Sequence, residues 1–274
     1  MESTRLPLEG LIDSHFHLLE MRKQGLEPES ILYDLHSQGL AGGLDVGISA
    51  DDVAERSQLL APWPNIRIAA GIGPWGAQGE HEIEAEVIRF ATSTTAFGIE
   101  CIGEIGLDNY WHYGTPSRQR ELFILQLELA SEWKLPIAIH TREADEETLS
   151  VFRDRDFPYG GVLHCFSSTW EVARTALDKG LHISFAGPIT YRKNESLRRM
   201  LAAIPADQLL LETDSPYLSP EPYRGKTNTP ARMVTIYAEA ARIRGVTAEH
   251  LAQQILCNFN SLFPIRDTPV LLGG

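Results

Sequence analysis

The chain has 274 residues, 43% of them hydrophobic and 22% charged, which is typical of a globular protein with a large core. Its net charge of −13 argues against broad adhesion to nucleic acid or anionic membranes, because that adhesion depends on Lys and Arg. Three widely spaced cysteines, no signal-peptide pattern in residues 1–10 and no run of roughly 18 apolar residues predict a cytoplasmic protein without a membrane span.

Strand-like apolar runs alternate with longer amphipathic segments along the chain. The expected strands are 11–18, 43–49, 66–73, 101–108, 136–141, 161–166, 181–186 and 209–213. The expected helices are 28–39, 51–60, 80–92, 116–133, 143–153, 168–179, 194–203, 230–244 and 248–262. Eight strands alternating with eight helices, plus one extra C-terminal helix, predict a (β/α)8 TIM barrel over residues 1–274 as a single domain. An open doubly wound sheet is the alternative.

Several helix ends carry local signals. Ser49 is expected to cap the helix that begins at residue 51. Ser168 and Glu171 have the spacing of a capping box. Gly245 is expected to end one helix, and Thr247 to cap the last.

The segment 71–76 matches the glycine fingerprint of dinucleotide-binding proteins. That fingerprint requires a helix to begin within it, so that the helix N-terminus meets the pyrophosphate. Pro74, Trp75 and the loop before Glu80 argue against such a helix. We therefore expect a turn that leaves Trp75 free to line a site.

His15 and His17 are the first candidate metal ligands. Side chains at i and i+2 of a strand point to the same face, so both imidazoles project together. Imidazole is the commonest metal-binding side chain.

Further donors follow at the carboxyl ends of other expected strands. In a barrel these ends meet at one rim, where active sites are built. Six donors exceed what one catalytic zinc takes and suit two metals that share a carboxylate, for which Glu104 is the natural bridge. Taken singly, His140 or His164 fits a core histidine, Glu104 an acid paired with arginine, and Asp214 a turn former. The six candidate ligands are His15, His17, Glu104, His140, His164 and Asp214.

Six segments resemble the TatD family of metal-dependent hydrolases, from about residue 10 to residue 263. The resemblance implies a TIM barrel with a dinuclear site and hydrolysis of phosphodiesters, many members being deoxyribonucleases. One metal would be held by His15, His17, Glu104 and Asp214, and the other by Glu104, His140 and His164. The matching segments are Asp13-Ser14-His15-Phe16-His17, Gly103-Glu104-Ile105-Gly106-Leu107-Asp108, Ile139-His140-Thr141-Arg142, His164-Cys165-Phe166-Ser167, Leu211-Glu212-Thr213-Asp214-Ser215-Pro216-Tyr217, and Arg224-Gly225-Lys226 with Asn228 and Pro230.

The chain departs from the family pattern at three positions. Gly73 stands where a histidine that contacts the substrate phosphate is usual, Thr229 where a glutamate is usual, and Ser168 where a glycine is usual. The metal ligands are intact, so these departures concern the choice of substrate.

The expected chemistry is attack by a water whose pKa two divalent ions (Mg, Mn or Zn) lower. Asp214 would act as the general base, with Glu104 as the second catalytic carboxylate. The expected substrate contacts are Arg142, Arg224 and Lys226 to phosphate, and Trp75 with Tyr110 or Trp111 to a base, although loop packing also explains each aromatic residue.

The expected partner is a short or single-stranded nucleic acid, or a small phosphodiester. Two divalent ions add +4 and two carboxylates subtract 2, so the rim holds roughly +2 within an acidic protein. The alternatives are a hydrolase of a small amide, lactone or ester, and a metal-binding interaction protein without turnover.

Overall fold

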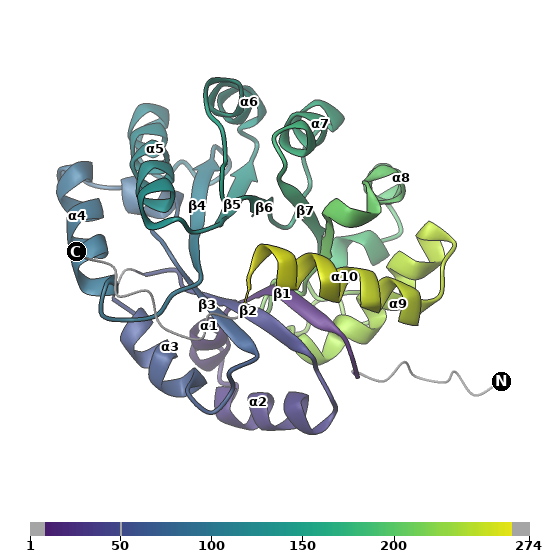
Figure 1. The fold of residues 1–274 in the computed structure, drawn as a ribbon. Helices are drawn as coiled ribbons and strands as arrows, with labels where there is room; N and C mark the ends of the chain where they lie inside the picture. Colours follow the sequence, from purple (N-terminus) through teal and green to yellow (C-terminus); the bar gives the residue numbers. More distant parts are fainter. Residues whose placement is uncertain (1–8, 50, 265–274) are drawn as a thin grey trace.

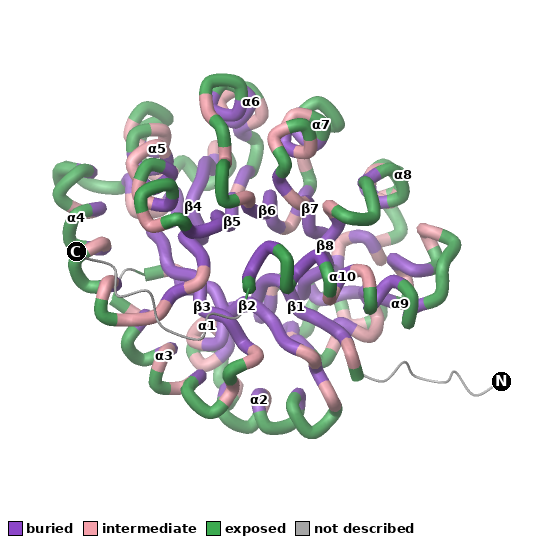
Figure 2. The backbone as a smooth tube through the Cα atoms, viewed as in Figure 1, coloured by how far each residue is buried: buried purple, intermediate pink, exposed green. Residues whose placement is uncertain are grey.

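The computed structural model describes residues 9–49 and 51–264, and its eight parallel strands form one sheet. Their spatial order follows the chain from β1 to β8 (Figure 1; β8 is labelled in Figure 2). The strands are β1 Ile12–Phe16, β2 Gly42–Val46, β3 Ile66–Ala70, β4 Cys101–Asp108, β5 Ile137–Arg142, β6 Gly161–Leu163, β7 His182–Phe185 and β8 Leu209–Leu211. The expectation about a signal peptide falls mostly on residues 1–8, which lie outside the described residues.

Contacts between the first and last strands nearly close the barrel. Phe16 and Ser215 form a parallel bridge. The buried Asp13 carboxylate accepts hydrogen bonds from the backbone N and Oγ1 of Thr213 at 2.9 and 2.6 Å. The prediction of a TIM barrel is therefore confirmed, and the doubly wound sheet is excluded.

The strands are largely buried. The helices surround them and present their outer faces to solvent (Figures 1 and 2). The α-helices are α1 Leu18–Lys23, α2 Pro28–Ser37, α3 Val53–Leu60, α4 Ile83–Thr94, α5 Pro116–Trp133, α6 Asp145–Asp154, α7 Trp170–Asp178, α8 Glu195–Ala203, α9 Met233–Arg244 and α10 Ala248–Leu262. Short 3-10 helices are η1 Pro74–Ala77, η2 Gly187–Thr190, η3 Ala206–Gln208 and η4 Pro230–Arg232. No described helix has the length and apolar character needed to cross a bilayer.

The expected extra helix, α10, covers the amino ends of several strands. Asn258 donates to the carbonyl of Leu209, where β8 begins, at 2.8 Å. Arg67, near the start of β3, donates to Asn260 and to the carbonyl of Phe263. The opposite face, at the carboxyl ends, is left for the functional site.

Two helix ends follow their sequence signals, and two do not. Thr247 accepts a hydrogen bond from the backbone N of His250 and caps α10, and Gly245 ends α9 with a φ of 67°. The capping box at Ser168 is wrong, because α7 begins at Trp170 and the Ser168 hydroxyl donates to Asp145 instead.

Three further differences between the predicted and the observed elements concern α1, α3 and the turn after β3. The first strand ends at Phe16, and Leu18 begins the unpredicted helix α1, whose Leu18 and Met21 are buried one turn apart. The prediction that Ser49 caps a helix from residue 51 is wrong, because α3 begins at Val53 with Asp52 as its N-cap, and the Ser49 hydroxyl accepts a hydrogen bond from the backbone N of Asp51 instead. Residues 74–77 form only a 3-10 turn, so the dinucleotide fingerprint is excluded.

Candidate metal centre

The structure brings all six predicted metal ligands together at the carboxyl rim. They come from the ends of five strands that lie far apart in the sequence, and four of the six are nearly fully buried. The predicted ligands are His15 in β1, His17 directly after it, Glu104 in β4, His140 in β5, His164 after β6 and Asp214 after β8.

One carboxylate oxygen of Glu104 faces the histidines of the first strand. Its Oε2 lies 3.7 Å from His15 Nε2 and 3.9 Å from His17 Nε2. Asp214 Oδ1 lies 3.4 Å from His17 Nε2 and 4.0 Å from His15 Nε2. The donor atoms of His15, His17 and Asp214 all lie within 4.8 Å of one another.

The other oxygen of Glu104 faces a different pair of histidines. Its Oε1 lies 2.8 Å from His140 Nδ1 and 3.1 Å from His164 Nε2. The ion-pair partners of Glu104 among the described residues are four histidines and no arginine, so the alternative of an acid paired with arginine is wrong. Glu104 thus stands between two groups of donors.

Three of the histidines are oriented through their second ring nitrogen. His17 Nδ1 contacts the carbonyl of Val46 at 2.8 Å, and His164 Nδ1 contacts Glu212 at 3.4 Å. The Glu212 carboxylate in turn accepts a hydrogen bond from Ser184. Such contacts fix the tautomer and the ring orientation of metal-binding histidines.

Asp108 orients the third of these histidines. Its Oδ2 contacts His140 Nε2 at 3.1 Å. Its Oδ1 accepts hydrogen bonds from the backbone N of Tyr110 and of Trp111 at 2.9 and 3.0 Å. No role was predicted from the sequence for Asp108 or Glu212. Strand alternation was an available signal, since Asp108 is four residues after Glu104 and Glu212 is two before Asp214.

The ionisation of the site follows from these contacts. Burial lowers the pKa of His15 well below its usual value, and the charges of His164 and His17 act in the same direction. Burial opposes the charged form of His17, but the hydrogen bond and charge of Asp214 raise its pKa to about 9. Burial opposes ionisation of Glu104, but His164 and His140 hold its pKa well below the usual range. Imidazoles and carboxylates arranged in this way fit divalent cations.

The two predicted arginine contacts each lie over a tyrosine ring. Arg142 is the exposed last residue of β5, and its Cζ lies 3.9 Å from the ring centroid of Tyr110. Arg224, in the loop after β8, lies 4.4 Å over the ring of Tyr191. Neither guanidinium forms an ion pair within 9–49 and 51–264. Lys226 is exposed in the same loop as Arg224.

The predicted aromatic contacts differ in their surroundings. Tyr110 and Trp111 are exposed, and Arg142 covers one face of Tyr110. Trp75 is partly exposed in η1, and its Nε1 donates to the carbonyl of Ile48 at 2.7 Å.

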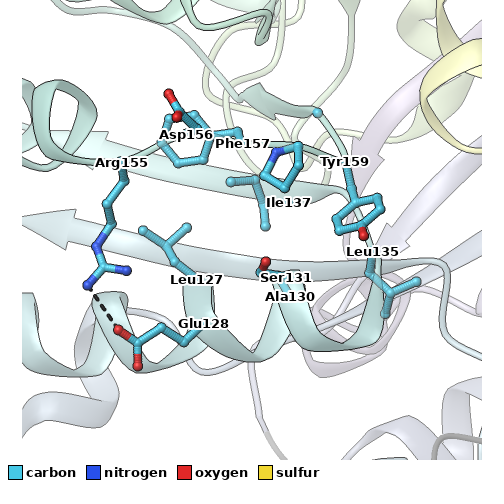
Figure 3. A pocket seen from close by; sticks show the side chains of 12 residues that line it. Leu127, Glu128, Ala130, Ser131, Leu135, Ile137, Arg155, Asp156, Phe157 and Tyr159 are labelled. Carbon is cyan, nitrogen blue, oxygen red and sulfur yellow. Dashed lines mark hydrogen bonds and ion pairs between the residues drawn. The ribbon is translucent and has the colours of Figure 1, made fainter.

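A cavity of about 270 Å³ lies away from this rim, beside the amino ends of β5 and β6 (Figure 3). Apolar side chains such as Leu127 and Phe157 line it, and Arg155 pairs with Glu128 at 2.9 Å. No histidine is among its described lining residues, so the chemistry belongs to the rim.

An eight-stranded barrel with histidines and carboxylates clustered at its carboxyl rim defines a class, the TIM-barrel hydrolases that depend on divalent metal. The family model described as TatD related DNase matches residues 12–264. The chain belongs to the TatD family and is a metal-dependent hydrolase.

Individual relatives agree with this assignment. The chain is 35% identical over 258 residues to the uncharacterized metal-dependent hydrolase YcfH of Escherichia coli K12, covering 93% of this chain and 96% of the relative. It is 32% identical over 234 residues to the 3'-5' ssDNA/RNA exonuclease TatD of Citrobacter koseri, covering 83% and 89%. The crystal structure of YJJV, a TatD homologue from Escherichia coli K12, superposes with a TM-score of 0.80 at 26% identity, covering 93% and 98%.

Proposed function

We propose that the protein hydrolyses phosphodiester bonds in single-stranded or short nucleic acids, with two divalent cations at the rim. The observation that carries the proposal is the position of the Glu104 carboxylate, whose two oxygens face different pairs of histidines. The exonuclease from Citrobacter koseri supports the substrate class.

The first cation would be held by His15, His17, Glu104 and Asp214, and the second by Glu104, His140 and His164. Mg²⁺, Mn²⁺ and Zn²⁺ are the candidates, and the four imidazoles favour Mn²⁺ or Zn²⁺ over Mg²⁺. Divalent cations supply Lewis-acid stabilisation of oxygen charge and a lowered pKa for water.

Side chains of the protein would supply the general base and the contacts to the substrate. The Asp214 carboxylate is partly exposed beside His17, so it can accept a proton from an attacking water. Arg142 and Arg224 stack on tyrosine rings, which leaves the edges of both guanidinium groups available for bidentate hydrogen bonds to phosphate. Lys226 adds a positive charge in the loop that carries Arg224. Tyr110 is a proposed base contact.

We also propose that residues 1–274 act as one hydrolase domain in the cytoplasm. The three cysteines, Cys101, Cys165 and Cys257, are all free thiols, which fits a reducing compartment.

The first test is metal analysis with a panel of substrates. The chelated protein is reloaded with Mn²⁺, Mg²⁺ or Zn²⁺ and assayed on single-stranded DNA, duplex DNA, methyl p-nitrophenyl phosphate, an amide and a lactone. We expect two cations per chain and turnover of single-stranded DNA. Turnover of only the amide or the lactone would overturn the proposed substrate class.

The second test is Asp214→Asn, which removes the proposed base. We expect roughly a 10²–10⁴-fold loss of turnover, the usual contribution of a positioned general base. Asp178→Asn, an exposed change on α7, is the matched control. Full activity of Asp214→Asn would overturn the proposed role of this carboxylate.

A further inference from the structure

Gly73 and Trp75 fit together at the turn after β3. A Cβ added at Gly73 would come closer than 3.0 Å to three carbon atoms of the Trp75 ring, a separation that real Cβ atoms do not show. Position 73 therefore accepts no side chain while the indole keeps its place. The indole occupies the space into which a side chain at position 73 would extend.

The indole is fixed from two directions. Its Nε1 donates to the carbonyl of Ile48 at 2.7 Å. Its ring meets Tyr113 edge to face, with centroids 6.2 Å apart and an interplanar angle of 80°. Trp75 and Tyr113 are both partly exposed. A fixed aromatic surface binds a ligand with little loss of side-chain entropy.

This pair lies close to the metal centre. A Cβ added at Gly71, two residues before Gly73, would lie 2.9 Å from the backbone of Gly103, which precedes Glu104. Burial raises the pKa of the Tyr113 phenol, and the charge of Asp108 raises it further, whereas Arg142 lowers it. The Tyr113 phenol is thus within electrostatic reach of Asp108, which orients His140, and of Arg142, a proposed phosphate contact.

We propose that Trp75, supported by Tyr113, stacks on an unpaired nucleobase of the substrate. The inference rests on the proposed phosphodiesterase function and adds a determinant of specificity to it. Every base has an aromatic face, so the preference is for nucleic acid as a class and tolerates any sequence. A base inside a duplex has both faces covered by its neighbours, so the contact favours single strands and frayed ends.

The test compares oligothymidylate with an abasic deoxyribose phosphate oligomer of equal length. Loss of one base–aromatic stacking contact weakens binding roughly 5- to 150-fold. We therefore expect Trp75→Ala to lower the ratio of the two kcat/KM values by roughly tenfold, through KM. Trp75→Phe retains an aromatic face and should keep most of the preference. Tyr33→Ala removes an exposed aromatic residue on α2 and is the matched control.

A binding measurement separates this inference from the proposed function. Wild-type protein and Trp75→Phe are titrated with oligothymidylate in Ca²⁺, and tryptophan fluorescence is recorded. Quenching that Trp75→Phe loses supports the contact, whether or not the oligomer is hydrolysed. Unchanged quenching in Trp75→Phe, or an unchanged substrate preference in Trp75→Ala, overturns it. If the wild-type protein hydrolyses neither oligomer with any metal, the proposed function fails, and the titration still decides whether Trp75 binds bases.

Discussion

At the scale of single residues, His17 holds a proton that a divalent cation bound as proposed would have to displace. Its Nδ1 is engaged by the carbonyl of Val46, and its Nε2 lies 3.4 Å from Asp214. Burial opposes the charged imidazole, but Asp214 raises the pKa of His17 to about 9. At neutral pH the cation-free site therefore contains an imidazolium where the metal ligand is needed.

Metal affinity should accordingly rise with pH. Below about 9 the His17 proton has to leave before Nε2 can bind a cation, so His17 alone makes the apparent affinity fall up to about tenfold per pH unit as the pH decreases. Above that pH this dependence ends. Calorimetry at pH 7.5 in two buffers of different ionisation enthalpy measures the proton released. The absence of proton release would contradict the assigned ionisation of His17.

The six donors could be predicted because strand alternation and the common rim of a barrel bring them together. Asp108 and Glu212 were missed because their roles depend on which ring nitrogen of a histidine they meet. Strand alternation indicates that both carboxylates face the rim, but the orientation of each histidine ring depends on the packing of the rim itself. Gly73 was recognised as a departure, but its fit with the Trp75 ring required coordinates.

At the scale of elements, a buried arginine joins the strands and helices beside the first histidines. Arg56 in α3 donates to Asp45 of β2 at 3.0 Å, to Asp52 at 2.8 Å and to the carbonyl of Ala69 in β3 at 2.9 Å. Asp45 also accepts a hydrogen bond from the backbone N of Leu18, where α1 begins. This cluster fixes the turn that follows His17.

Arg56→Met should destabilise the fold strongly. Arg56 and Asp45 are both fully buried, and removal of one partner from such a pair leaves a buried charge at a cost of about 3–5 kcal/mol. Arg22 forms exposed ion pairs with Glu29 and Glu55, so Arg22→Met should cost less than about 1 kcal/mol. Urea unfolding of both metal-free variants measures the difference. Equal midpoints would show that the Arg56 cluster does not stabilise this region.

Long, strongly periodic elements were predictable, whereas short ones were not. The helix Pro116–Trp133 was predicted with its observed bounds, because Leu122, Leu125 and Leu129 recur at helical spacing. The six residues of α1 carry too short a pattern. The capping box failed because Asp145, distant in sequence, takes the Ser168 hydroxyl.

At the scale of the whole molecule, the two ends of the barrel have different tasks. The carboxyl rim carries the polar cluster, and α10 closes part of the amino end with Ile255 and Phe259 fully buried. TIM barrels commonly divide function and stability in this way.

Phe259→Ala should therefore reduce stability without changing metal binding. The loss of a buried phenylalanine side chain costs about 3–5 kcal/mol. The folded fraction should still bind as many cations as the wild-type protein, while Glu104→Gln should bind fewer. Urea unfolding and metal analysis of the purified folded proteins measure both effects. Loss of cations in Phe259→Ala would show that the two ends are not independent.

The barrel itself was predictable from the alternation of strands and helices. The particular contact that helps to close it was not, since Asp13 and Thr213 lie 200 positions apart in the sequence. The choice of substrate could not be predicted from the metal ligands, because it depends on loops that follow different strands.

Asp108 has one more consequence. One of its oxygens contacts the proposed metal ligand His140, and the other accepts a hydrogen bond from the backbone N of Tyr110, over whose ring Arg142 lies. The proposed cation site and the proposed phosphate contact therefore both depend on the position of Asp108. Thermodynamic reciprocity requires that whatever factor the cation adds to phosphate affinity, the phosphate adds to cation affinity. We expect bound substrate to raise the affinity of the metal centre for its cations, so that the enzyme binds its cations most tightly while substrate is bound.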